Sequence, residues 1–152
     1  PNGIGKGFGD HLSIGANTPK DVISAAYFAY STSLMAEIAA VLGKDEDAAK
    51  YNEQFQNLRQ HFQDAYVDAD GKINGHTQTA YCMALQYDLL TDAQRIQAAD
   101  HLVERVEAKN YHLSVGFLGV PLLLPTLTEI GRSDLAYRLI QNRSYPSWGY
   151  SI

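Results

Sequence analysis

The sequence has 152 residues, of which 45% are hydrophobic and 19% are charged, and this balance predicts one globular domain with a sizeable core. A net charge of −5 without any basic run argues against nucleic acid or an anionic membrane surface as a partner. The single cysteine excludes an internal disulfide, and no apolar run reaches the length of a membrane span.

A first helix is predicted over about 18–42. Thr18 is a good N-cap, Pro19 suits the first helical position, and Asp21 suits the positive end of the helix dipole. After that first turn, Glu37 is the only charged residue of the predicted helix. A helix with almost no charged face is expected to be buried on nearly all sides.

Five further helices are predicted, in the order charged, apolar, charged, apolar, charged. Their ranges are about 45–66, 77–87, 92–109, 119–130 and 134–142. Thr91 and Gln94 form a capping box before the fourth helix, and Ser133 is expected to cap the sixth. Short connections between successive helices are typical of antiparallel helix hairpins.

This alternation predicts an all-α fold of three antiparallel hairpins, with the apolar helices in an inner layer and the charged helices in an outer layer. Residues 1–152 then form a single unit, which is either half of an (α/α)6 toroid or a short α-solenoid. In both arrangements every inner helix begins at the same end of the layer. The loops before the first, third and fifth helices are therefore expected to open on one face.

Polar and aromatic residues gather in those three loops and in the tail after the last helix. The candidate ligand-binding residues are Asp10, His11, Gln78, His112, Phe117, Trp148 and Tyr150. Flat rings beside polar groups suit a sugar, because a ring covers the apolar face of a pyranose and a tyrosine adds a hydroxyl. Two alternatives, in which these residues have only a structural role, stay open. Each histidine taken alone can be a core residue bonded to the backbone, and the tail rings can simply pack on the core.

No metal or cofactor site is predicted. His11, His76 and His112 come from separate loops, and no pair of them has the spacing of a zinc site. Glycoside hydrolysis usually needs two carboxylates, and Asp10 is the one acid that we place on the candidate face. A complete catalytic site therefore cannot be assembled from this sequence.

Five segments form an ordered set that covers nearly the whole chain. They are 9–13 (GDHLS), 18–31 (TPKD followed by AYFAYS), 77–81 (TQTAY), 111–119 (YHLSVGFLG) and 145–150 (YPSWGY). This set resembles the catalytic domain of bacterial α-L-rhamnosidases, an inverting family of glycoside hydrolases with an (α/α)6 barrel. Since such a barrel has six hairpins, the resemblance implies that this chain is the second half of it.

The resemblance also implies that no catalytic residue lies in this sequence. The general acid of the family lies in an Asp-Glu-Arg segment upstream, and the general base is a Glu in a Trp-Glu segment that follows the last motif. The sequence is therefore expected to be a piece of a longer protein and to be inactive alone. Two positions depart from the family pattern, because His11 replaces a usual Trp and Val115 replaces a frequent Thr. Both leave room for a changed substrate preference.

The function implied by the resemblance is that of a glycosidase that cleaves terminal α-L-rhamnosyl linkages of a glycoside or polysaccharide with inversion. This chain would contribute a substrate-binding wall, and no cofactor is required. The alternative is a non-enzymatic α-solenoid that binds a peptide or a partner helix. The inner helices would expose apolar edges where the other half of the barrel is expected to pack. We therefore predict that the isolated chain self-associates, for example as a homodimer. The sequence assigns no compartment.

Overall fold

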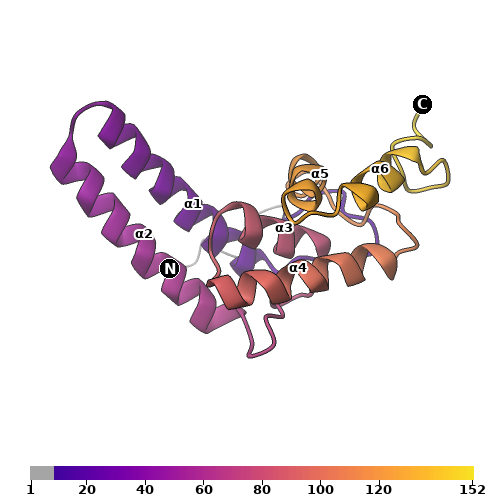
Figure 1. Ribbon diagram of the computed structural model, residues 1–152, viewed down its shortest axis with the longest axis horizontal. Coiled ribbons are helices and arrows are strands. Elements are labelled where there is room, and N and C mark those ends of the chain that lie inside the picture. The colour runs from indigo at the N-terminus through magenta and orange to yellow at the C-terminus, as the bar shows by residue number, and fades with distance from the viewer. Residues whose placement is uncertain (1–8) are drawn as a thin grey trace.

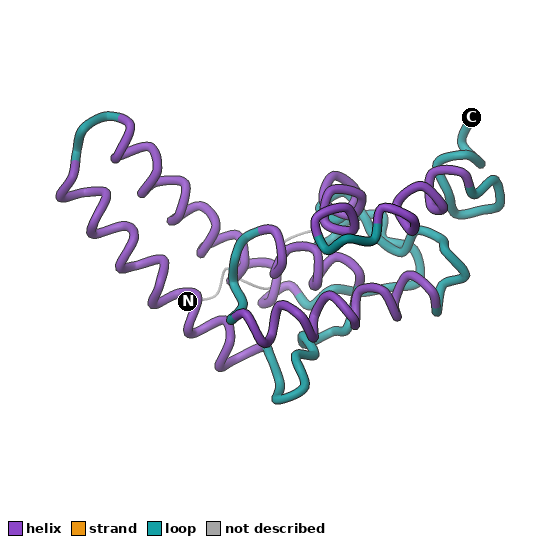
Figure 2. The backbone as a smooth tube through the Cα atoms, in the orientation of Figure 1, coloured by secondary structure: helices purple, strands orange, loops and turns teal. Residues whose placement is uncertain are grey.

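Helices dominate the computed structural model, which describes residues 9–152 (Figures 1 and 2). The six helices are α1 (Lys20–Val41), α2 (Asp45–Tyr66), α3 (Gln78–Gln86), α4 (Asp92–Glu107), α5 (Val120–Glu129) and α6 (Ser133–Gln141). A single antiparallel bridge joins Val67 to Ile73, and the described chain has no longer strand. The predicted all-α class is confirmed.

The helices pair as three hairpins, α1 with α2, α3 with α4, and α5 with α6. Helix α3 also contacts both α1 and α5, so the three apolar helices are neighbours, and each carries its charged partner (Figure 1). This is the predicted alternation of inner and outer helices. The first hairpin projects from the other four helices as a long arm (Figure 1).

Helix α3 lies at the centre of the core. All residues from Gln78 to Leu85 are buried, and Tyr81, Met83 and Leu85 are at most 2% exposed. Thr77 caps the helix, because its side chain accepts a hydrogen bond from the Ala80 amide. A helix without charge can be buried all round when neighbours cover every face, and α1, α4 and α5 provide that cover here.

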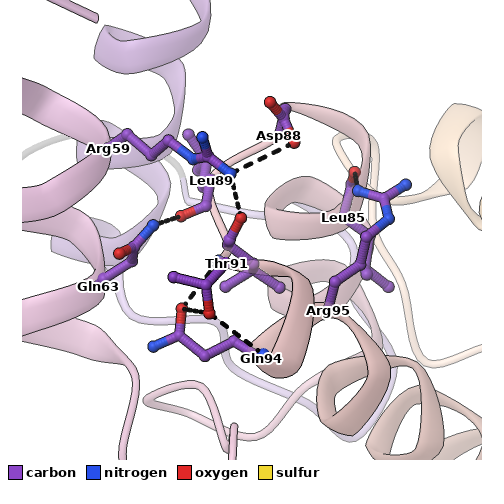
Figure 3. A network of polar contacts seen from close by, with 9 residues as sticks. Arg59, Gln63, Leu85, Asp88, Leu89, Thr91, Gln94 and Arg95 are labelled. Atoms are coloured by element: carbon purple, nitrogen blue, oxygen red, sulfur yellow. Dashed lines mark hydrogen bonds and ion pairs between the residues drawn. The ribbon is translucent and has the colours of Figure 1, made fainter. Parts of the chain in front are cut away.

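Helix α2 is amphipathic and packs one face on α1, with Phe55 and Phe62 buried. Its polar side reaches the connection between α3 and α4 (Figure 3). Gln63 donates to the Leu89 carbonyl at 2.9 Å, and Arg59 donates to the Leu90 carbonyl. These bonds satisfy carbonyl groups of a buried loop that would otherwise lack partners.

Helix α1 departs from the prediction, because it is not buried on nearly all sides. Phe28 is 54% exposed and Ile38 is 52% exposed, and Val41 and Leu42 at its end are exposed as well. The physical reason is that α2 covers one face and α3 touches α1, while no other helix among residues 9–152 packs extensively on it. An apolar strip along α1 therefore faces solvent.

Two predicted helix caps are also wrong, and one is confirmed. The N-cap of α1 is Pro19, and the Thr18 hydroxyl instead hydrogen-bonds the Thr77 hydroxyl at 2.7 Å. Ser133 is the first residue of α6 and makes no capping bond. The capping box of Thr91 and Gln94 before α4 is present with both of its bonds.

Candidate functional site

Asp10 ties together the starts of the three inner helices. Its carboxylate accepts a hydrogen bond from the Thr79 hydroxyl in α3, at 2.5 Å. It also accepts from the amides of Gly116 and Leu118, at 2.8 and 2.9 Å, in the loop before α5. The side chain is buried, at 7% exposure. The predicted meeting of the three loops on one face therefore rests on direct bonds.

Two glycines let these loops approach closely. A Cβ atom on Gly116 would lie 2.6 Å from the Asp10 carbonyl oxygen, which is rigid backbone. A Cβ atom on Gly119 would lie 2.7 Å from the Val115 side chain and would also meet the Thr79 hydroxyl. Any larger residue would push the loop before α5 away from Asp10 and from α3. The glycines of the YHLSVGFLG segment thus allow the loop before α5 to pack closely against Asp10 and α3.

His11 and Phe117 form an exposed ring pair on top of this junction. Their ring centroids lie 5.7 Å apart at an interplanar angle of 42°. The Phe117 amide donates to the His11 carbonyl at 2.9 Å, which fixes the two backbones side by side. Phe117 is 66% exposed although it is a large apolar residue. An exposed ring held in place by buried bonds is available to a ligand.

Gln78 and His112 are mainly engaged within the protein. The Gln78 amide donates to the carbonyls of Arg105 and His112, at 3.3 and 3.4 Å, and its oxygen accepts from the Ser114 amide at 3.1 Å. Gln78 is 1% exposed. These bonds hold the long loop between α4 and α5, which Figure 2 shows at the edge of the bundle.

His112 joins that loop to the C-terminal tail. Its Nδ1 lies 2.9 Å from the Lys109 carbonyl and can only donate there, so in the neutral ring Nε2 accepts from the Ser144 hydroxyl at 2.8 Å. The Leu113 amide donates to the Pro146 carbonyl at 3.2 Å. The tail is therefore fastened to the loop before α5, on the predicted face.

The tail presents its rings in two ways. Trp148 is half-buried and packs against the hydrophobic core. Tyr150 is exposed and meets Tyr145 edge to face, with centroids 5.4 Å apart. Ser147 fixes this turn, since its hydroxyl donates to the Asn142 carbonyl and accepts from the Tyr150 amide. Of the two predicted tail residues, Tyr150 is the one with an open ring.

His76 contacts Tyr81 beside the start of α3. The Tyr81 hydroxyl accepts from the Ile73 amide at 3.4 Å and shares a hydrogen bond of 2.5 Å with His76 Nδ1. Burial raises the pKa of Tyr81 to about 12. Burial lowers the pKa of His76 below its ordinary 6.5, and the charge of Arg105 lowers it further. Both effects favour the neutral form of the ring.

Among residues 9–152, no three His, Cys, Asp or Glu side chains gather closely enough to hold a metal ion. None of the helices in that range is long and apolar enough to cross a membrane. The donors at the junction are amides and a hydroxyl that already bond a carboxylate, which leaves no ready ligand set for a cation.

Several residues that bond on this face were not predicted from the sequence. Thr79 and Tyr81 lie inside an apolar helix and Ser144 in a polar turn, and nothing in their spacing marks them as partners of residues far away in the chain. A helix period of 3.6 places Thr79 and Met83 on one face, but it does not reveal which loop covers that face.

Comparison with known proteins identifies the fold. Residues 2–152 match the family model of the bacterial alpha-L-rhamnosidase six-hairpin glycosidase domain. An alpha-L-rhamnosidase of Streptomyces avermitilis is 54% identical over 146 residues, and one of Formosa agariphila is 41% identical over 138 residues. These alignments cover 96% and 90% of this chain, but only 14% and 15% of the relatives.

Solved structures agree with the sequences. The crystal structure of the Streptomyces avermitilis alpha-L-rhamnosidase complexed with L-rhamnose matches with a TM-score of 0.93 over 95% of this chain and 14% of that one. The native enzyme of Aspergillus terreus matches with a TM-score of 0.86 at 35% identity, over 90% of this chain and 16% of that one. The chain spans about one seventh of the length of the Streptomyces avermitilis relative. It therefore belongs to the bacterial alpha-L-rhamnosidase six-hairpin glycosidase family.

Proposed function

We propose that the protein containing this chain is an α-L-rhamnosidase, which cleaves terminal α-L-rhamnosyl linkages of a glycoside or polysaccharide with inversion. The observation that carries the proposal is the junction of three loops at Asp10, which holds the exposed rings of His11 and Phe117 on one face. The relative of known structure with 54% identity was solved with L-rhamnose. Membership in a glycosidase family disfavours the alternative, a non-enzymatic α-solenoid.

Within that enzyme, this chain supplies a wall of the sugar site. His11, Phe117 and Tyr150 contact the sugar, Trp148 backs the wall, and Gln78 and His112 hold the loops in place. Asp10 contributes chiefly by position. A carboxylate has about four acceptor sites, and three of those of Asp10 are taken by groups of the protein itself. At most one remains for a sugar hydroxyl.

The two catalytic carboxylates come from other parts of the protein. Inversion needs an acid that protonates the leaving oxygen and a base that activates water on the opposite face, with the two carboxyl groups roughly 6.5–9.5 Å apart. Asp10 is the one buried acid among residues 9–152, and its bonds commit it to the loops. This chain therefore binds and orients the sugar without performing the proton transfers.

The experiment compares the full-length protein with the isolated chain on an aryl α-L-rhamnoside. The full-length protein should release rhamnose, and proton NMR at early times should show the β anomer, as inversion requires. The isolated chain should release none. Turnover by the isolated chain that disappears on mutation of one of its own acids would refute the division of roles. A full-length protein that releases no rhamnose would refute the activity.

A further inference from the structure

A basic pocket lies on the face that carries the proposed sugar wall. Its volume is about 350 Å³, and its lining includes Asn17, His76, Gln78, Arg105, Lys109 and Ser114. The loops before α1, α3 and α5 all contribute, together with the last turn of α4 and the residues that follow it. A volume of roughly 300 Å³ or more is enough for a small ligand.

The pocket is positively charged within a protein of net charge −5. Arg105 and Lys109 line it, and none of its lining residues is acidic. Thr77 and Gln78 also line it, so the positive end of the α3 dipole points the same way. Cations without a neutralising acid attract an anion from outside the chain.

Arg105 is the central group of this pocket. Within residues 9–152 its guanidinium makes no hydrogen bond or ion pair, and its Nε is buried without a partner. Lys109 donates one bond from Nζ to the Gly15 carbonyl at 3.1 Å, which leaves two further donors. A guanidinium normally finds a partner when it is partly buried, because leaving its donors unpaired costs free energy.

We propose that this pocket binds the carboxylate of an acidic sugar that neighbours the rhamnose in the substrate. The proposal rests on the proposed rhamnosidase function. The planar fork of Arg105 fits the two oxygens of a carboxylate. Ser114 lines the pocket and Phe117 lies on the wall, three residues apart. Three residues span at most about 11 Å, a reach that adjoining sugars of one chain can bridge.

The test uses the full-length enzyme and two rhamnosides that differ at one group. One carries a uronic acid next to the rhamnose, and the other carries the methyl ester of that acid. The readout is the ratio of kcat/KM for acid over ester, which cancels any general effect of a mutation on catalysis. The wild-type ratio should be roughly ten to a hundred, as expected for charged hydrogen bonds.

Four variants give the ratio its meaning. Arg105→Gln and Lys109→Gln should each lower the ratio toward one, while Arg105→Lys, which keeps the charge, should retain part of it. Lys50→Gln removes a lysine from the exposed side of α2 and should leave the ratio at its wild-type value. Circular dichroism of each variant confirms that the fold is kept.

The outcomes separate the pocket from the function. Equal cleavage of acid and ester by the wild-type enzyme overturns the pocket and leaves the rhamnosidase activity standing. Cleavage of neither overturns the proposed function. A third substrate carries a sulfate ester in place of the carboxylate. If the enzyme prefers it through Arg105, the assignment to a carboxylate is wrong.

Discussion

Asp10 shows how one buried carboxylate can organise a face of the molecule. Its three donors lie 69, 106 and 108 residues further along the chain. Each bond is charge-assisted, and such bonds are roughly twice as strong as neutral ones. The carboxylate satisfies two backbone amides just before α5, so it does for that loop what an N-cap does for a helix.

Asp10→Asn should loosen the loop before α5 and lower activity. The substitution keeps the size of the side chain, but it replaces one carboxylate oxygen with an NH2 group. That group cannot accept the hydrogen bonds that the oxygen accepts. The bonds lost are worth about 1.5–3 kcal/mol, so the amides of Gly116 and Leu118 should exchange with deuterium roughly ten to a hundred times faster. The kcat/KM for an aryl rhamnoside should fall by a similar factor in the full-length enzyme.

Asp64→Asn is the matched control for that experiment. Asp64 lies exposed on α2, and its one bond is to Gln60 at 2.9 Å on the same helix. Loss of this bond should change neither the hydrogen exchange of the Gly116 and Leu118 amides nor the kcat/KM. If Asp10→Asn behaves like Asp64→Asn, the three bonds to Asp10 do not hold the site together.

His76 should make the region around α3 less stable at acid pH. Its pKa is lowered by burial and by Arg105, so in the folded protein it takes up a proton at a lower pH than the ordinary 6.5. The unfolded chain binds that proton first, and stability therefore falls as pH drops below about 6.5, until the folded form is protonated as well. Hydrogen exchange of the α3 amides, measured across that range, should show faster opening at lower pH.

His76→Asn should flatten that pH dependence. The backbone of His76 has a φ of 46°, and asparagine tolerates this left-handed region better than most residues. The comparison variant is His61→Asn, on the exposed side of α2. A wild-type slope that persists in His76→Asn would show that another group carries the acid sensitivity.

At the scale of single residues, the sequence predicted which loops meet, but it did not predict the bonds that join them. Asp10 bonds the loop before α5 and His112 bonds the tail, because helix alternation brings these segments to the same end of the bundle. Their partners were not predictable. Thr79 and Ser144 are bonded through the tertiary fold, and no local pattern encodes a contact between distant segments.

Among the helices, predictions were accurate where a local signal decided the outcome. The range 45–66 of α2 is observed as predicted, because its charged first turn and amphipathic period lie within the helix itself. The capping box at Thr91 is local in the same sense. The burial of α1 was wrong because burial depends on neighbours, and an apolar sequence shows only that a helix would accept them.

Thr91→Ala should fray the start of α4. The Thr91 hydroxyl accepts from the Gln94 amide at 3.3 Å, and the Gln94 side chain accepts from the Thr91 amide at 3.0 Å. Loss of such a cap typically costs about 1 kcal/mol, which corresponds to roughly fivefold faster exchange of the first α4 amides. The Thr91 turn also follows the buried connection held by α2 (Figure 3).

Thr128→Ala is the control at the same scale. Its hydroxyl donates to the Leu124 carbonyl at 3.0 Å on the surface of α5, where no orphan amide depends on it. Exposed substitutions of this kind change stability by about 0.5 kcal/mol or less. If the first α4 amides exchange at the same rate in both variants, the capping box contributes nothing measurable to the stability of α4.

Across the whole molecule, the apolar strip of α1 is the feature that the described chain leaves uncovered. Phe28, Met35, Ile38, Val41 and Leu42 are all exposed, and Glu37 is the only charged residue within 28–42. They lie on the projecting arm that Figure 1 shows apart from the other helices. Contiguous apolar surface of this kind marks a contact with another chain or another part of the same protein.

The isolated chain should therefore self-associate through α1. A symmetric dimer would bury the same strip on both copies, and each large side chain taken from water contributes about 1.5–3 kcal/mol. Sedimentation velocity over a concentration series should show a species larger than the monomer. Ile38→Glu places a charge in the middle of the strip and should shift the equilibrium to the monomer, because a buried unpaired charge is costly. Gln56→Glu adds the same charge to the exposed side of α2 and should leave association unchanged. A wild-type chain that stays monomeric at high concentration would show that the α1 strip does not drive association.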